Sequence, residues 1–203
     1  AFAHSGGVSL VLRLLSTHCP RLDELHTPVA LAELLREESG LILVTGSTGS
    51  GKSTTLAAMV DHLNHQLAGH IVTLEDPVEF LHESGSCLIH QREVGLHTSS
   101  FSEALRAALR QDPDVILLGE LRDSDTIRLA LTAAETGHLV LATLHTRGAA
   151  QAIERLIDVF PAQEKDPVRN QLASSLCAVL SQKLQPDKHG GRVALFEMLI
   201  DRK

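Results

Sequence analysis

The sequence predicts an α/β fold in which a mostly parallel sheet is flanked by helices. Short apolar runs alternate with amphipathic stretches of helical length along the whole chain. One apolar run, Leu41–Val44, leads directly into the glycine-rich motif Gly46–Ser53, and the stretch Thr54–Leu67 behind it has helical character. Strand, loop and helix in this order are the context of a phosphate-binding loop of the pattern G-x-x-x-x-G-K-[ST]. The length of 203 residues allows one sizeable core.

One strand and one helix are expected before this motif. Val8–Leu15 alternates loosely between apolar and polar residues and predicts a strand. Val29–Glu38 predicts a helix with Pro28 at its first position and Gly40 at its end. Leu41–Thr45 is then the buried strand before the loop.

The middle of the chain continues the alternation. Ile71–Leu74 and Cys87–Glu93 predict strands. Ser100 and Glu103 have the spacing of a capping box, so they predict the start of a helix. That helix is expected to end before Asp112-Pro113, because the residue before a proline disfavours helical geometry.

The next segment predicts a strand, a helix and a second strand. Val115–Leu118 is fully apolar and predicts a buried strand. Ser124 or Asp125 is expected to cap a helix that Gly137 ends. Leu139–Thr143 is the following strand.

Two helices and a strand are expected in the last part. Gly148–Val159 and Pro167–Leu184 have amphipathic patterns, and Asp166 is placed to cap the second helix. Arg192–Ile200 predicts the final strand.

The glycine-rich motif predicts a nucleotide site. Its glycines let backbone N–H groups point at phosphate oxygens, and the following helix adds positive charge at its start. Lys52 is expected to reach the β- and γ-phosphates, and the Ser53 hydroxyl to bind Mg²⁺. A turn without chemical meaning is the alternative, which the match at all eight positions disfavours. The residues expected to hold the nucleotide are Gly46, Ser47, Thr48, Gly49, Ser50, Gly51, Lys52, Ser53 and Thr54.

Carboxylates follow two of the predicted strands. Ligands of such sheets bind beyond the carboxyl ends of the strands, so these groups should meet at the phosphate loop. Glu120, after Gly119, is the first carboxylate beyond its strand, and it could bind the Mg²⁺ water shell or polarise the attacking water. Glu75 and Asp76 suit metal coordination or water activation. The alternative for Glu120 is a surface glutamate without a role, and the alternative for Glu75 and Asp76 is an ordinary turn rich in Asp and Pro.

Histidines and arginines supply the remaining candidates. His138 and His145 bracket a strand, too far apart to share a metal, and either could sense the γ-phosphate. Arg92, Arg122 and Arg13 are candidates for stabilising charge at the γ-phosphate, within one subunit or between neighbours. A structural role is the more frequent one for each of these residues taken alone.

Composition excludes several classes of function. The net charge is −7 without a basic block, and aromatic residues make up 2% with no Trp or Tyr, which disfavours nucleic-acid motors. No apolar stretch reaches the ~18 residues of a membrane span, and no signal peptide is visible. Cys19, Cys87 and Cys177 are far apart, which fits a reducing cytoplasm and provides no metal site besides the expected Mg²⁺.

Several motifs together resemble those of one protein family. Thr45–Thr55 matches its phosphate loop, Thr73–Phe80 its Asp box, Asp112–Asp123 its Walker B segment and Thr132–Thr146 its His box. Two further segments are typical of one branch: Gln91–Val94 and Asp158–Pro161. On these residues the chain resembles the type II and type IV secretion ATPases, and most closely the type IV pilus retraction (PilT-like) ATPases.

The resemblance implies a RecA-like P-loop NTPase core, a hexameric ring and hydrolysis of Mg-ATP at subunit interfaces. It implies a motor at the cytoplasmic face of the bacterial inner membrane, acting on a platform protein of a pilus or secretion system. It also implies catalytic roles for the following residues: Lys52, Glu75, Glu120, His138 and His145, with Ser53 and Glu120 at Mg²⁺. Interface or charge-stabilising roles are implied for Asp76, Glu79, Arg92, Arg122 and Arg13.

The resemblance also divides the chain. Residues 1–15 would be the remnant of an N-terminal PAS-like domain, 16–40 a linker and helix, and 41–203 the RecA-like ATPase domain without the family's C-terminal helices. The four-cysteine zinc element of the extension and type II secretion branches has no counterpart, which favours the retraction branch. Two alternatives stay open: a nucleotide-gated assembly subunit with little turnover, and a type II secretion or pilus extension ATPase.

Overall fold

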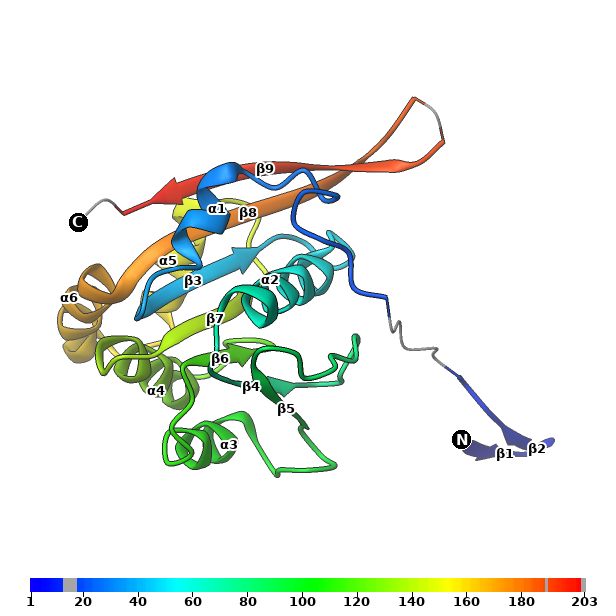
Figure 1. Ribbon diagram of the computed structural model, residues 1–203. Coiled ribbons are helices and arrows are strands. Elements are labelled where there is room, and N and C mark those ends of the chain that lie inside the picture. Colours follow the sequence, from blue (N-terminus) through cyan, green and yellow to red (C-terminus); the bar gives the residue numbers. More distant parts are fainter. Residues whose placement is uncertain (13–17, 189, 202–203) are drawn as a thin grey trace.

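Seven strands form one sheet in the order β5-β4-β6-β7-β3-β8-β9. The computed structural model describes residues 1–12, 18–188 and 190–201. The strands of this sheet are β3 Gly40–Thr45, β4 His70–Glu75, β5 Leu88–Glu93, β6 Val115–Leu118, β7 Leu139–Leu144, β8 Leu176–Pro186 and β9 Arg192–Ile200. Every neighbouring pair is parallel except β8 and β9, which form an antiparallel hairpin (Figure 1). The predicted α/β class with a mostly parallel sheet is therefore confirmed.

Helices cover both faces of the sheet. They are α1 Val29–Leu34, α2 Lys52–Gln66, α3 Phe101–Ala108, α4 Ser124–Glu135, α5 Ala149–Asp158 and α6 Lys165–Ser175, with a short 3-10 turn at Ala162–Glu164. Strand side chains alternate between two cores because the pleat turns successive residues to opposite faces. In β3, Leu41 and Leu43 pack with α3 to α6, whereas Ile42 and Val44 pack with α1 and α2.

The longest predicted helix is wrong in its second half. Pro167–Leu184 was expected to be helical, but α6 ends at Ser175 and Leu176 begins β8. Leucines at every fourth position, Leu172, Leu176 and Leu180, imitate a helical stripe. The run from Leu176 to Gln182 is buried throughout, because β8 lies between β3 and β9.

Smaller corrections concern element ends. Asp123, not Ser124 or Asp125, caps α4, and its side chain accepts from the Thr126 amide. Asp166 lies within the first turn of α6 and is not its cap. In the first part, α1 begins after Pro28 and ends at Leu34, four residues before the predicted end.

The N-terminal segment forms a separate two-stranded sheet, β1 Phe2–His4 with β2 Gly7–Ser9. The predicted strand Val8–Leu15 is reduced to the first two of its residues, and residues 10–12 have no regular structure. Residues 13–17 lie outside the described residues, so the division at residue 15 stays a prediction. Within the described part of the chain, no helix is long and apolar enough to cross a membrane.

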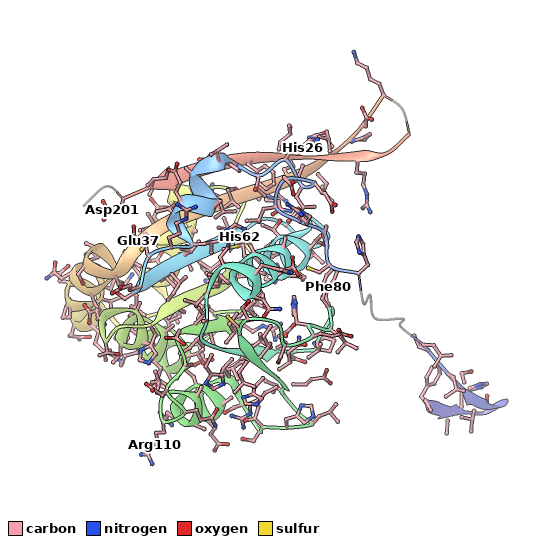
Figure 2. All side chains as sticks on the ribbon, in the orientation of Figure 1. His26, Glu37, His62, Phe80, Arg110 and Asp201 are labelled. Atoms are coloured by element: carbon pink, nitrogen blue, oxygen red, sulfur yellow. The ribbon has the colours of Figure 1, made fainter. Side chains whose placement is uncertain are left out.

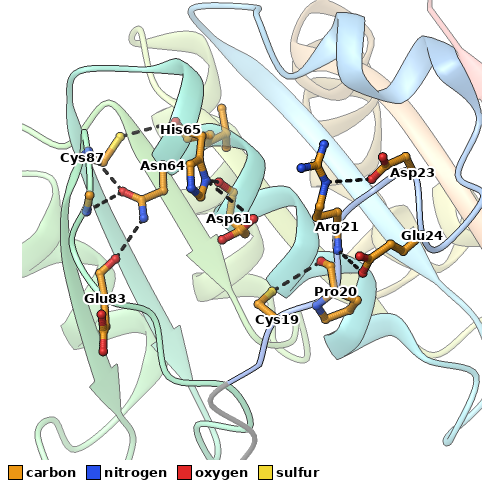
Figure 3. Close-up of polar contacts among 12 residues, drawn as sticks. Cys19, Pro20, Arg21, Asp23, Glu24, Asp61, Asn64, His65, Glu83 and Cys87 are labelled. Atoms are coloured by element: carbon orange, nitrogen blue, oxygen red, sulfur yellow. Dashed lines mark hydrogen bonds and ion pairs between the residues drawn. The ribbon is translucent and has the colours of Figure 1, made fainter.

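The strand β5 is tied to α2 through one buried amide. Asn64 donates to the Glu83 carbonyl at 2.9 Å and accepts from the Gly85 and Cys87 amides at 3.0 and 3.2 Å (Figure 3). This contact fixes the segment that leads into β5 and therefore the position of β5 at the sheet edge.

Candidate nucleotide site

A pocket lies where the carboxyl ends of β3, β4, β6 and β7 meet. The predicted site residues that line it are Thr48, Gly49, Lys52, Ser53, Glu75, Asp76, Glu79, Glu120, Arg122 and His145. Their order in the sheet explains the meeting, because β4, β6, β7 and β3 are consecutive neighbours. The sequence placed these groups at one edge, and the structure brings them together.

Two glycines of the phosphate loop are required by its geometry. A Cβ on Gly46 would lie 2.3 Å from the Gln182 carbonyl oxygen, and the residue has φ +151°. Gly51 precedes α2 with φ +91°, a left-handed conformation that favours glycine. Helix α2 therefore begins at Lys52, with its N-terminus at the pocket.

Lys52 is buried inside the loop. Its ammonium donates to the carbonyls of Gly46 at 3.0 Å and Ser47 at 3.2 Å, and lies 3.3 Å from His145 Nδ1. Burial lowers the pKa of Lys52, while the charges of Glu120 and Glu79 oppose this shift. The ammonium is thus held at the pocket wall, within reach of an anion.

A glutamine of β8 supports the loop from behind. Gln182 is 5% exposed; its Nε2 donates to the Ser50 carbonyl at 2.7 Å and its Oε1 accepts from the Thr55 hydroxyl at 2.8 Å. No role was predicted for Gln182, because it falls within the expected helix Pro167–Leu184, whereas it lies in β8. A polar residue within an apolar strand neighbouring β3 was the signal that could have identified it.

Glu120, Arg122 and His145 form a polar network at the pocket. Arg122 binds the Glu120 carboxylate at 2.7 Å, and His145 Nε2 lies 3.3 Å from the same oxygen. Because an ammonium can only donate, His145 Nδ1 accepts from Lys52 and Nε2 donates to Glu120. Burial would raise the pKa of Glu120, but the Arg122 hydrogen bond and the His145 contact together hold it below its usual value.

Thr45 fixes the segment that carries His145. Its hydroxyl contacts the Leu144 carbonyl at 3.2 Å and the Thr146 hydroxyl at 2.6 Å, and accepts from the Thr146 amide at 3.0 Å. His145 therefore has both chain neighbours attached to the end of β3.

Glu75 has different surroundings. Its Oε1 accepts from the Thr73 hydroxyl at 2.6 Å and from Gln91 Nε2 at 3.1 Å. Burial raises the pKa of Glu75 above its ordinary value, although these two donors partly oppose the shift. Gln91 belongs to a segment typical of one branch of the family, but no role for its side chain is predicted from the sequence.

The segment after Glu75 is held by β5. Gln91 Nε2 also donates to the Phe80 carbonyl at 2.8 Å, and its Oε1 accepts from the His82 amide at 2.8 Å. Glu93 accepts from the Val78 amide at 3.0 Å. Figure 2 labels Phe80, which also lines the pocket. Asp76 and Glu79 are carried to the pocket by this segment.

Two predicted residues outside the phosphate loop, His138 and Arg92, do not line the pocket. His138 precedes β7 at the amino edge of the sheet, where its carbonyl accepts from the Gly40 amide at 3.1 Å. The expectation that His138 meets the phosphate loop is therefore not met in this chain, because the two histidines flank opposite ends of one strand. Arg92 donates to the His97 carbonyl at 3.3 Å and does not line the pocket. Arg13 lies outside the described residues.

The pocket fits a hard divalent cation next to a phosphate. Ser53 and Glu120 both line it, and hydroxyl and carboxylate oxygens are the ligands that Mg²⁺ prefers. Among residues 1–12, 18–188 and 190–201, no group of three or more His, Cys, Asp or Glu is arranged to hold a metal by itself. An ion here would therefore depend on phosphate oxygens and water for its other ligands.

Comparison with known proteins adds a family and a fold match. The model of the type II/IV secretion system protein family matches residues 3–193. The chain is 74% identical over 201 residues to the uncharacterized protein YggR of Escherichia coli (strain K12), covering 99% of this chain and 62% of YggR. It is 55% identical over 200 residues to the type IV pilus retractation ATPase PilT of Pseudomonas aeruginosa, covering 98% of this chain and 58% of PilT.

A solved structure has the same fold. The crystal structure of the pilus retraction motor PilT with bound ADP superposes with a TM-score of 0.91 at 49% identity, over 94% of this chain and 56% of that chain. The RecA-like core is thereby confirmed. The chain spans about 60% of the length of the curated relatives named above.

Proposed function

The chain belongs to the type II/IV secretion system protein family, and from this premise we propose that it is the ATP-hydrolysing part of a motor of the pilus retraction type. The observation that carries the proposal is the convergence of Lys52, Glu75, Glu120 and His145 on one pocket at the phosphate loop. A relative with the same fold holds ADP. The four side chains supply the charge and hydrogen-bonding groups that phosphoryl transfer requires.

The chain's own residues would act as follows. Lys52 leaves the Gly46 and Ser47 carbonyls, which are weak partners for an ammonium, and binds the β- and γ-phosphates. A carboxylate from Glu120 or Glu75 orients the attacking water. His145 touches both Lys52 and Glu120, so it would report the loss of the γ-phosphate to the carboxylate.

Mg²⁺ would be held by Ser53 and, directly or through water, by Glu120. When bound, the ion supplies neutralisation of phosphate charge. Arg122 and Asp76 line the same pocket, and we propose that Arg122, Asp76 and Glu79 stabilise charge there or at a subunit boundary. Similar roles for Arg92 and His138 require a neighbouring subunit, because this chain does not bring them into its own pocket. A role of this kind for Arg13 stays a proposal from the sequence.

Membership of the family supports a proposal for the larger assembly. We propose a homo-oligomer, a hexameric ring, that hydrolyses ATP at subunit interfaces and moves a neighbour by opening and closing them. It would act in the cytoplasm at the inner membrane on a platform protein, without nucleic acid. The proposed domains are 1–15 as a PAS-like remnant, 16–40 as linker and helix, and 41–203 as the ATPase domain.

Steady-state ATP hydrolysis, measured against protein concentration, tests this function. We expect Mg²⁺-dependent turnover that rises with assembly, is lost in Lys52→Ala, and falls by about 100-fold or more in Glu120→Gln. ATP binding with negligible turnover in the unmodified protein would favour the nucleotide-gated assembly subunit. Absence of nucleotide binding would refute the proposal as a whole.

A second comparison addresses the direction of the motor. In cells that assemble pili, loss of a retraction motor leaves surface pili in place, whereas loss of an extension or secretion ATPase removes the pilus or the secreted product. Complementation with the unmodified gene and with Lys52→Ala links either phenotype to nucleotide binding.

A further inference from the structure

The two strands at one edge of the sheet place a second set of polar side chains behind Glu75. In the register of β4 and β5, Thr73 pairs with Gln91 and Glu75 with Glu93. Residues two apart on a strand share a face, and paired residues of neighbouring strands do too. Thr73, Glu75 and Gln91 therefore form one cluster, fixed by strand pairing.

Both side-chain donors of this cluster bind the same carboxylate oxygen. Thr73 is fully buried, and its hydroxyl donates to Glu75 Oε1 at 2.6 Å; Gln91 Nε2 donates to Oε1 at 3.1 Å. No other side chain of the described residues is recorded as a donor to this carboxylate, so Oε2 is left to the pocket. The backbone amide of Glu79 also favours the ionised form.

The orientation of the Gln91 amide is determined by its partners. Its Oε1 accepts from the His82 amide, and its Nε2 donates to both the Phe80 carbonyl and Glu75. Reversing the amide would set two donors against each other at His82 and two acceptors against each other at Phe80 and Glu75. Gln91 thus always presents an N–H to the carboxylate.

Glu120 has partners of a different kind. Its Oε2 contacts both Arg122 and His145, so that oxygen is engaged by cationic or donating partners within the pocket. Glu75 has no cation within ion-pair distance among the described residues. Each carboxylate leaves one oxygen to the pocket, Oε2 of Glu75 and Oε1 of Glu120, but only Glu75 is held by neutral donors alone. Its charge is therefore not balanced by a cation, and Glu75 is the better acceptor for a proton of water.

We propose that Thr73 and Gln91 are positioning residues, which hold Glu75 so that its Oε2 orients the attacking water. The proposal rests on the proposed ATPase function and selects Glu75 for a role that the pocket alone leaves shared with Glu120. Neither Thr73 nor Gln91 lines the pocket; each acts through the carboxylate.

The test compares Thr73→Val with Thr73→Ser. Valine has nearly the shape of threonine without the hydroxyl, while serine retains the donor. Because the lost donor favoured the ionised carboxylate, Thr73→Val should move the acid limb of kcat upward by about one pH unit. We expect KM for ATP to stay within twofold, and Thr73→Ser to restore the original profile. Thr27→Val, in the segment before α1 and outside the motifs named above, is the control for loss of a hydroxyl that donates to a carbonyl.

Gln91→Leu provides the second arm, with a larger loss of kcat because it also releases the Phe80 and His82 contacts. The Glu75 carboxyl is titrated directly by ¹³C NMR in the unmodified protein and in Thr73→Val, which requires no activity. An unchanged titration and an unchanged pH profile in Thr73→Val would overturn the proposal. A rise in KM without a change in kcat would also overturn it.

Failure of the proposed ATPase function can be distinguished from failure of the positioning role of Thr73 and Gln91. If the unmodified protein and Lys52→Ala hydrolyse ATP equally slowly, the ATPase assignment is wrong, and the water-orienting role of Glu75 is wrong with it. If only Lys52→Ala is inactive while Thr73→Val behaves as unmodified protein, the ATPase stands and the positioning role is refuted.

Discussion

Replacing Gln182 by leucine tests whether β8 supports the phosphate loop. The substitution removes two buried hydrogen bonds, one to the Ser50 carbonyl at 2.7 Å and one from the Thr55 hydroxyl at 2.8 Å. It leaves both partners in a buried environment, since Ser50 is 3% and Thr55 1% exposed. A rotation of the Thr55 hydroxyl toward a carbonyl of its own helix would recover part of the second loss.

The expected cost follows from these two groups. An unsatisfied buried carbonyl costs about 1–3 kcal/mol, and the partly compensated hydroxyl adds about 1 kcal/mol. A loss of about 2–4 kcal/mol in the free energy of unfolding corresponds to a decrease in Tm of about 4–16 °C for a chain of this size. We also expect ATP affinity to fall about tenfold, because the loop is no longer held in its binding geometry.

Thermal unfolding without nucleotide and equilibrium binding of a fluorescent ATP analogue measure the two effects. Gln151→Leu, at an exposed position of α5, is the matched control and should change neither quantity. A double-mutant cycle with Thr55→Val isolates the coupling between the two side chains. The supporting role is refuted if the Tm of Gln182→Leu stays within about 1 °C, and its affinity for ATP within about twofold, of the values for the unmodified protein.

Two further predictions concern stability. Burial raises the pKa of Glu75 in the folded state, so its ionised form opposes folding once the pH exceeds the unfolded value, and this contribution is absent well below it. Glu75→Gln should therefore raise Tm at neutral pH and leave it nearly unchanged near pH 4, as measured by thermal scans at both values; a stabilisation confined to acid pH would contradict the sign. Asn64→Ala removes the three contacts that hold residues 83–87 and should lower the free energy of unfolding by about 2–4 kcal/mol in urea titrations, whereas Asn170→Ala on α6 should have little effect.

Much of the site could be predicted from short stretches of sequence. The phosphate loop is predicted by a local pattern: its glycines, the apolar strand before it and the helix after it are contiguous within residues 41–67. The carboxylates Glu75 and Glu120 were found because each follows an apolar run. Residues that end parallel strands meet at one edge whatever the order of those strands.

Hydrophobic periodicity gave a wrong prediction for residues 176–184, because a helix and a buried strand can have the same pattern of apolar residues. Leucines four apart from Leu172 to Leu184 fit a helical stripe as well as a strand buried on both faces, and the difference is whether neighbouring strands are present. The neighbouring strands β3 and β9 are not part of this segment, so its own sequence does not reveal them. The error concealed Gln182, since a residue assigned to a helix gives no reason to look for it behind the phosphate loop.

The sequence by itself determined the fold class, the phosphate loop and the identity of the two carboxylates. Only the tertiary structure decided that Thr73 and Gln91 bind one oxygen of Glu75, and that Gln182 supports the loop from β8. The physical reason is that these relations depend on which strands pair and in which register. Pairing joins residues far apart in the chain, such as Ser50 and Gln182, through contacts that neither local sequence records.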